Sequence, residues 1–202
     1  MKLQNHTKFT ILAALLMSIT LAACQQPGDP GASSPQVDTA PANVIASLIE
    51  RAQSAPSPES ERLLIQAAQL LLEQEKPGEA QRLLESVNVT SLDNDTRAAL
   101  VLTLADIYLA QGEPLQAEEL LTTDRMGLLT AANELSAERL NEISLKRATV
   151  WEFNGNYLSA ARERIFVAPM LSEEASATNH QRIWGDLIAI PNDTLQQLAS
   201  TV

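Results

Sequence analysis

The sequence has very few of the side chains on which most enzyme and metal chemistry depends. Its 202 residues include one Cys, two His, two Trp, two Tyr and three Phe. A single Cys excludes an intramolecular disulfide framework and a zinc site built from cysteines. With only two His, the chain has few side chains that could build a metal centre or a histidine-dependent catalytic site. We therefore expect no metal, no cofactor and no catalytic residue.

Positive charge is also scarce. The chain holds 14 Lys and Arg against 25 Asp and Glu, which gives a net charge of -11 at pH 7. A polyanion such as nucleic acid would be repelled by this charge, so we expect no nucleic-acid partner. Aromatic residues make up only 3%. Because sheets favour aromatic and β-branched residues whereas Ala and Leu favour helices, the composition predicts helix.

Residues 1–23 predict a secretory signal peptide. Lys2 and Lys8 give its start a positive charge, and an apolar segment follows over residues 9–21. That segment is short for a membrane span and is interrupted by hydroxyl side chains, as in a cleaved leader.

The leader ends in Leu21-Ala22-Ala23-Cys24, which resembles the lipobox of bacterial lipoproteins. The resemblance implies lipidation of Cys24, cleavage before it, and stable anchoring by several acyl chains. It also implies export to the outer membrane, because Gln25 stands where Asp would cause retention in the inner membrane. The alternative is an ordinary leader in which this Cys is incidental.

A change of composition divides the rest of the chain. Residues 24–43 are rich in Pro and Gly and predict a flexible linker behind the lipidated Cys. From residue 44 the apolar side chains recur at helical spacing, which predicts a helical domain over residues 44–202. The sequence stops inside a predicted helix, so we expect this domain to be the amino-terminal part of a longer protein.

Three pairs of predicted helices share one register. Each pair has an Ala in its second helix, another Ala twelve residues earlier, and a large side chain between them. Two pairs also have a Gly in the connection, where the first pair has Glu75. These repeat positions are Ala68 and Ala80; Ala105, Gly112 and Ala117; and Ala148, Gly155 and Ala160.

This register resembles the tetratricopeptide repeat, although the copies are spaced more widely than its ~34 residues. The resemblance predicts an all-α fold of tetratricopeptide-like helical hairpin repeats that form a short solenoid. An unrelated helical bundle with Ala-rich faces is the alternative.

A few other side chains could carry chemistry, and each has a plainer interpretation. We expect His180 to be a surface residue, because no nucleophile motif accompanies it. Adjacent carboxylates on a helix point in different directions, so we expect two acidic pairs to be solvated. We expect three aromatic residues to pack in the core rather than line a peptide groove. These residues are Glu118-Glu119 and Glu173-Glu174, and Trp151, Tyr157 and Trp184.

The lipobox, the linker and the degenerate repeats together resemble the LpoA-type lipoprotein activators of penicillin-binding proteins. The residues that carry the resemblance are residues 63–84, which look like the first repeat of that family, and Arg182-Ile183-Trp184-Gly185-Asp186-Leu187. The resemblance implies a non-catalytic lipoprotein on the periplasmic side of the outer membrane that activates a class A penicillin-binding protein, a peptidoglycan synthase. It implies contact with the synthase through a carboxy-terminal domain absent from this sequence. The alternatives are a helical-repeat scaffold lipoprotein of another envelope assembly machine and, less in keeping with the composition, a cell-wall hydrolase.

Overall fold

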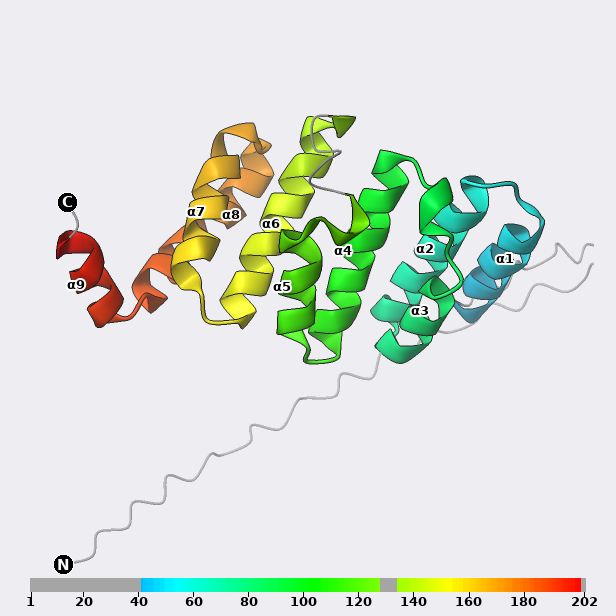
Figure 1. The fold of residues 1–202 in the computed structure, drawn as a ribbon, viewed down its shortest axis with the longest axis horizontal. Coiled ribbons are helices and arrows are strands. Elements are labelled where there is room, and N and C mark those ends of the chain that lie inside the picture. The colour runs from blue at the N-terminus through cyan, green and yellow to red at the C-terminus, as the bar shows by residue number, and fades with distance from the viewer. Residues whose placement is uncertain (1–40, 128–133, 201–202) are drawn as a thin grey trace, which may run out of the picture. The chain divides into compact units, whose positions relative to one another are not determined.

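The computed structural model describes residues 41–127 and 134–200, which all belong to one compact unit spanning residues 38–202 (Figure 1). These two ranges are helical and contain no strand, so the all-α prediction is confirmed. The predicted signal peptide and Cys24 lie outside the described residues. The helices are α1 (Pro41–Ser54), α2 (Glu59–Glu73), α3 (Pro77–Leu84), α4 (Asn94–Ala110), α5 (Pro114–Thr122), α6 (Ala137–Phe153), α7 (Tyr157–Val167), α8 (Glu173–Ala189) and α9 (Asn192–Ser200).

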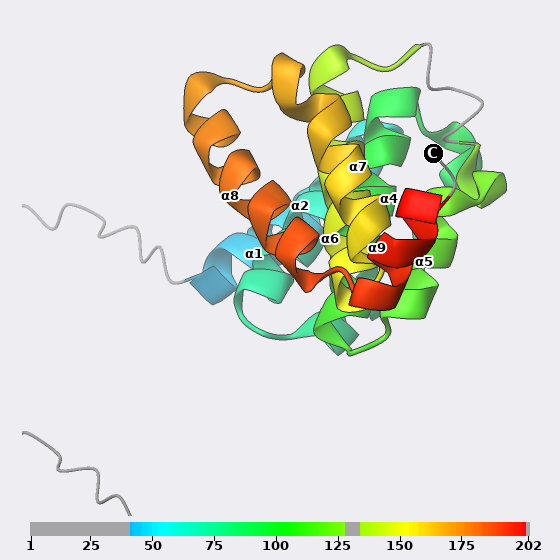
Figure 2. The same cartoon turned by 90° about the vertical axis from the view of Figure 1, so that its left-hand side faces the viewer.

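The helices pack in chain order. The pairs α2/α3, α4/α5 and α6/α7 form hairpins, and contacts of α2 with α4 and of α4 with α6 join one hairpin to the next. At the two ends α1 packs on α2 and α8 on α7, as the views in Figures 1 and 2 also show. Each hairpin therefore packs mainly against its neighbours, and the predicted tetratricopeptide-like repeat fold is confirmed.

All three hairpins turn in the same way. A left-handed residue follows the first helix of each, with φ of 59° at Glu75, 76° at Gly112 and 73° at Gly155. The amide after it closes the turn onto the first helix in the Schellman manner. These bonds run from Lys76 N to Leu71 O (2.9 Å), Glu113 N to Tyr108 O (2.8 Å) and Asn156 N to Trp151 O (2.8 Å).

Small side chains lie where the two helices of each hairpin pack together. The six repeat alanines, two per hairpin, all have 0% exposure. Without bulk at these places, the backbones can approach closely while larger residues fill the space beside them. The two described core clusters, one around α2–α4 and one around α4–α6, each include some of these alanines. The six are Ala68, Ala80, Ala105, Ala117, Ala148 and Ala160.

A side-chain hydrogen bond recurs between successive hairpins. Gln111, just after α4, donates from Nε2 to Oε1 of Gln81 on α3 at 2.7 Å. One hairpin later, Asn154 donates from Nδ2 to Oε2 of Glu118 on α5. Glu118 also accepts a bond from Nε1 of Trp151 at 3.1 Å. The prediction of a solvated carboxylate is therefore wrong for Glu118, because the next hairpin covers it and supplies two donors.

The start of the helical region also differs from the prediction. Helix α1 begins at Pro41, so residues 41–43, predicted as linker, form its first turn. Pro suits the first turn of a helix because its missing N–H would have no partner there. The predicted linker 24–43 therefore ends three residues too late.

Candidate interaction surfaces

Three polar side chains singled out in the sequence lie on the surface of α8. His180 is exposed on α8, and so are Glu173 and Glu174 at the start of that helix. Within residues 41–127 and 134–200, no three His, Cys, Asp or Glu side chains gather in a way that could hold a metal ion. In the same two ranges no helix has the length and apolar character needed to cross a membrane.

The first helices of the hairpins line a series of adjoining hollows, which we call the first-helix groove. One hollow, of about 260 Å³, lies between α2 and α4; a second, of about 430 Å³, between α4 and α6; and a third, of about 480 Å³, among α6, α7 and α8. Neighbouring hollows share lining residues, namely Gln69, Ala99 and Arg139 for the first two and Leu145 and Thr149 for the last two.

Polar side chains of both signs cross this groove. Arg62 on α2 pairs with Asp93, just before α4, at 2.5 Å between Nη2 and Oδ2. Lys146 on α6 pairs with Asp106 on α4. These exposed or half-exposed pairs add little stability, but they place charged groups along one polar surface.

Large apolar side chains are exposed mainly on α6 to α9. They include Phe153 (63% exposed), Phe166 (67%), Trp184 (66%) and Ile188 (81%). The prediction that Trp184 packs in the core is therefore wrong. Of the large apolar side chains on α8, Ile183 is buried whereas Trp184 and Ile188 are exposed, because α7 covers one narrow side of that helix.

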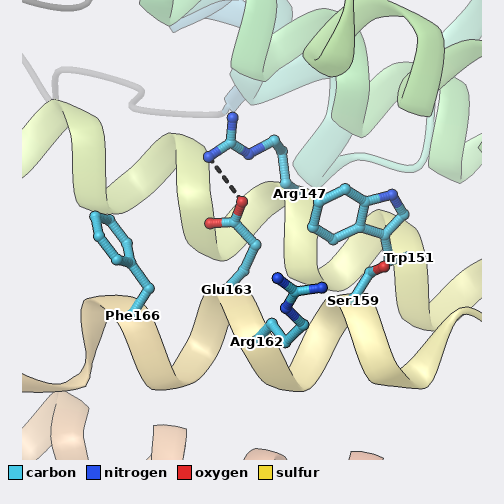
Figure 3. Close-up of a pocket in the computed structure, with 6 residues that line it drawn as sticks. All are labelled: Arg147, Trp151, Ser159, Arg162, Glu163 and Phe166. Carbon is cyan, nitrogen blue, oxygen red and sulfur yellow. Dashed lines mark ion pairs between the residues drawn. The ribbon is translucent and has the colours of Figure 1, made fainter. Parts of the chain in front are cut away.

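A further hollow, which we call the α6–α7 groove, lies between the two helices of that hairpin (Figure 3). It measures about 530 Å³ and is lined by Arg147 and Trp151 of α6 and by Ser159, Arg162, Glu163 and Phe166 of α7. Figure 3 shows Phe166 at one end, Trp151 and Ser159 toward the other, and an ion pair between them. In that pair, Nη2 of Arg147 lies 2.9 Å from Oε1 of Glu163.

Buried charges join α6, α7 and α8. The Arg164 side chain on α7 is 6% exposed and lies between two carboxylates. Its Nε donates to Oε1 of Glu152 on α6 at 2.8 Å and lies 3.3 Å from Oδ2 of Asp186 on α8. Arg182 on α8 pairs with the other Glu152 oxygen at 3.0 Å, and Asn179 donates to the Arg164 carbonyl at 2.9 Å. We call Glu152, Arg164 and Asp186 the buried ion cluster, whereas Arg182 reaches it from the surface with a side chain that is 60% exposed.

Burial makes Asp186 the unusual member of this cluster. Its side chain is 5% exposed. Desolvation, and next the negative charge of Glu152, raise the pKa of Asp186 to about 6, although Arg164 acts in the opposite direction. The cluster thus contains a carboxyl group that changes charge in a mildly acidic range, at the contact that holds α8 to the hairpin before it.

Neither the α6–α7 ion pair nor the buried ion cluster was found from the sequence. The sequence carries one signal for the first. In the common register, Arg147 stands where the earlier hairpins have Ala67 and Leu104, and Glu163 stands where they have Leu83 and Leu120. A charged residue at a position that is apolar in sister repeats marks a place where the repeat does something other than pack.

Comparisons with known proteins agree with the repeat fold. Residues 38–201 match the model of a family described as LppC putative lipoprotein. Among solved structures, the chain resembles the crystal structure of the E. coli LpoA amino terminal domain, with a TM-score of 0.55 and 18% identity, over 80% of this chain and 71% of that one. A search of curated protein sequences gave no significant match.

The two matches carry different information. The structural likeness, at low identity, shows a shared helical-repeat fold. The family match covers the whole span from α1 to α9. The helical repeats therefore share the fold of the LpoA amino terminal domain, and the chain belongs to the LppC lipoprotein family.

Proposed function

We propose that this chain is the helical-repeat region of an outer-membrane lipoprotein that activates a class A penicillin-binding protein without catalysing a reaction itself. The observation that carries the proposal is the family match across residues 38–201, combined with a fold like that of the LpoA amino terminal domain. The lipobox-like Leu21-Ala22-Ala23-Cys24 supports the lipid anchor.

The arrangement of the described helices supports a role through contact. Stacked hairpins present extended surfaces for binding other proteins, and the first-helix groove runs past α2, α4, α6 and α8. A regulator needs only to bind the active conformation of its synthase more tightly than the inactive one, because that difference shifts the population toward activity.

The test is a reconstitution with purified components. The chain from Cys24 onward is added to a purified class A synthase, both alone and joined to the expected carboxy-terminal domain, and glycan polymerisation and peptide crosslinking are followed separately. We expect at least one rate to rise when that domain is present. Peptidoglycan is also incubated with the chain alone, and release of muropeptides there would contradict the non-catalytic proposal.

A pair of charge reversals connects the effect to the groove. Arg139→Glu changes a residue that borders two of its hollows, whereas Arg82→Glu changes an exposed arginine on α3 outside it. We expect the first variant to weaken synthase activation and the second to leave it unchanged. If no class A synthase responds even when the carboxy-terminal domain is present, the proposal fails and a scaffold role in another envelope machine takes its place.

Anchoring is tested separately. We expect mass spectrometry to find acyl chains on Cys24, and the protein to fractionate with the outer membrane. Cys24→Ala should release it from that membrane or leave the leader uncleaved. An unmodified Cys24 thiol in the natural protein would contradict the anchor.

A further inference from the structure

We infer that the α6–α7 groove binds the free carboxyl end of a protein chain whose last residue has a large apolar side chain. This inference goes beyond the proposed activation of a synthase and does not depend on it. It rests on the shape of the groove, on its charge, and on a comparison of the three hairpins.

The groove combines a cationic side with aromatic walls. Arg162 is exposed and forms no ion pair in the described part of the chain. Trp151 is half-buried and is fixed in place by its bond to Glu118, so its ring forms a rigid wall. Phe166, at the far end, is 67% exposed and has most of its ring free for contact.

The first two hairpins show that packing does not require this polar arrangement. Where α6 and α7 have Arg147 and Glu163, the first hairpin has Ala67 and Leu83. Both of those residues belong to the apolar core or pack against it. The second hairpin has Leu104 and Leu120 at the same places, and these are half-buried against the apolar core clusters.

The polar pair also carries a cost within its own hairpin. Nε of Arg147 and Oε2 of Glu163 are buried and have no hydrogen-bond partner. Buried polar atoms without partners destabilise a fold, whereas the apolar pairs of the sister hairpins avoid this penalty. The hairpin's own stability therefore does not explain why Arg147 and Glu163 are there.

The charge and the rings together select the ligand. Arg147 is paired with Glu163, so Arg162 supplies the cation that remains unpaired among the described residues of this groove, on a chain of net charge -11. Guanidinium groups bind carboxylates with two parallel hydrogen bonds, which favours a free carboxyl terminus. Contact with two aromatic rings stabilises a large apolar last side chain more than a methyl group, because the binding free energy grows with the apolar area that is buried. This favours a protein terminus over a cell-wall peptide that ends in D-alanine.

The experiment follows the indole N–H signal of Trp151 by NMR in the chain from Cys24 onward. A Trp184→Phe background leaves Trp151 as the only Trp. Three probes are titrated: acetyl-Ala-Ala-Phe as the free acid, the same peptide as the carboxamide, and acetyl-Lys-D-Ala-D-Ala. We expect the free acid to shift the signal and to bind at least about tenfold more tightly than either other probe.

Variants at matched positions test which residues are responsible. Arg162→Ala should weaken binding of the free acid about tenfold. Arg82→Ala is the control, because Arg82 holds the same register position on α3 and is also exposed. Phe166→Ala should weaken the free acid and the carboxamide alike. Equal binding of acid and carboxamide, tighter binding of the D-alanine probe, an unchanged Arg162→Ala variant, or an equal loss in Arg82→Ala would each overturn the inference.

Discussion

At the scale of single residues, the three hairpin turns differ in how well their sequence suits the backbone. Glu75 has a φ of 59°, whereas the matching turns have Gly112 and Gly155. A residue with a side chain pays a steric penalty in this left-handed conformation, and Gly does not. The first turn is therefore less favourable than the other two.

We expect Glu75→Gly to raise the free energy of unfolding by about 0.5–1 kcal/mol, because the strain is larger than the added chain entropy. Gly112→Ala should lower it by about 1 kcal/mol. Nothing lies within 4 Å of a Cβ at Gly112, so the effect comes from the backbone alone. Urea unfolding measures both changes. Gly78→Ala is the control, since Gly78 has no positive φ; a loss of stability there like that of Gly112→Ala would count against the argument.

Ala117 is 0% exposed between α5 and its neighbours. We expect Ala117→Glu to lower the free energy of unfolding by about 3–5 kcal/mol, because it buries a charge that has no partner. Gln116→Glu adds the same charge one residue earlier, at an exposed place in the first turn of α5, and should have almost no effect. Thermal unfolding by circular dichroism compares the two. Similar melting temperatures in both variants would contradict the hairpin packing.

Residue types predicted the packing positions well and the polar contacts poorly. The repeat alanines could be placed because every hairpin needs small side chains at the same crossings. The environments of Glu118 and Trp184 depend on which neighbouring helix covers them. Glu118 lies under the next hairpin, whereas Trp184 lies on a side of α8 that is left open. A linear pattern records how often apolar residues recur but not how far the neighbouring helix extends.

At the scale of helices, two carboxylates give opposite dependence on pH. Asp93 caps α4 by accepting a hydrogen bond from Thr96 N at 2.7 Å. That bond, aided by Arg62, lowers the pKa of Asp93 below its usual value. The folded state therefore holds this proton less strongly than the unfolded state. Its contribution to stability is present above about pH 4 and is lost as the pH falls.

Asp186 has the opposite sign. Its pKa is raised to about 6 in the fold, against about 3.9 in an unfolded chain. The folded state therefore holds the proton more strongly. The contribution is greatest below about pH 4 and is lost as the pH rises through about 6.

We expect Asp186→Asn, which resembles the protonated form, to become more stable relative to the unmodified chain as the pH rises from 4 to 7. The relative gain is roughly 2 kcal/mol, measured by urea unfolding at each pH. Asp93→Ala should behave oppositely, with its largest loss, about 1 kcal/mol, near pH 7. Glu174→Gln, an exposed change on α8, is the neutral control. A pH-independent difference for Asp186→Asn would refute the assignment.

The starts of some helices carry a chemical signal in the sequence. Helix α4 starts after Asp93, α6 starts after Ser136, and both caps accept a bond from the third residue of the helix. The end of the linker carries no such signal, because Pro41 is compatible with a linker and with a first helical turn alike. That ambiguity is the physical reason for the misplaced boundary.

At the scale of the whole described region, burial is uneven along the stack. Helix α4 buries eight of its 17 residues, whereas α8 buries three of 17. Since stability in repeat proteins comes from each unit and its nearest neighbours, the centre should open less often than the end.

We expect amide hydrogen exchange to be slowest in α4, around the fully buried Leu100 and Ile107, and faster in α8. The two helices have equal length, so helix length does not account for the difference. Exchange read by NMR or mass spectrometry gives the order directly. Equal protection of both helices would mean that the described region opens as one cooperative unit.

The side-chain hydrogen bonds between successive hairpins affect how such chains can change in evolution. Gln111 reaches Gln81, and the shorter Asn154 reaches Glu118, through the same two positions of the register. The side chain that donates this hydrogen bond is one methylene shorter where Asn replaces Gln. A lineage can therefore alter the contact between successive hairpins with a single substitution at this half-buried position, leaving the alanine crossings untouched.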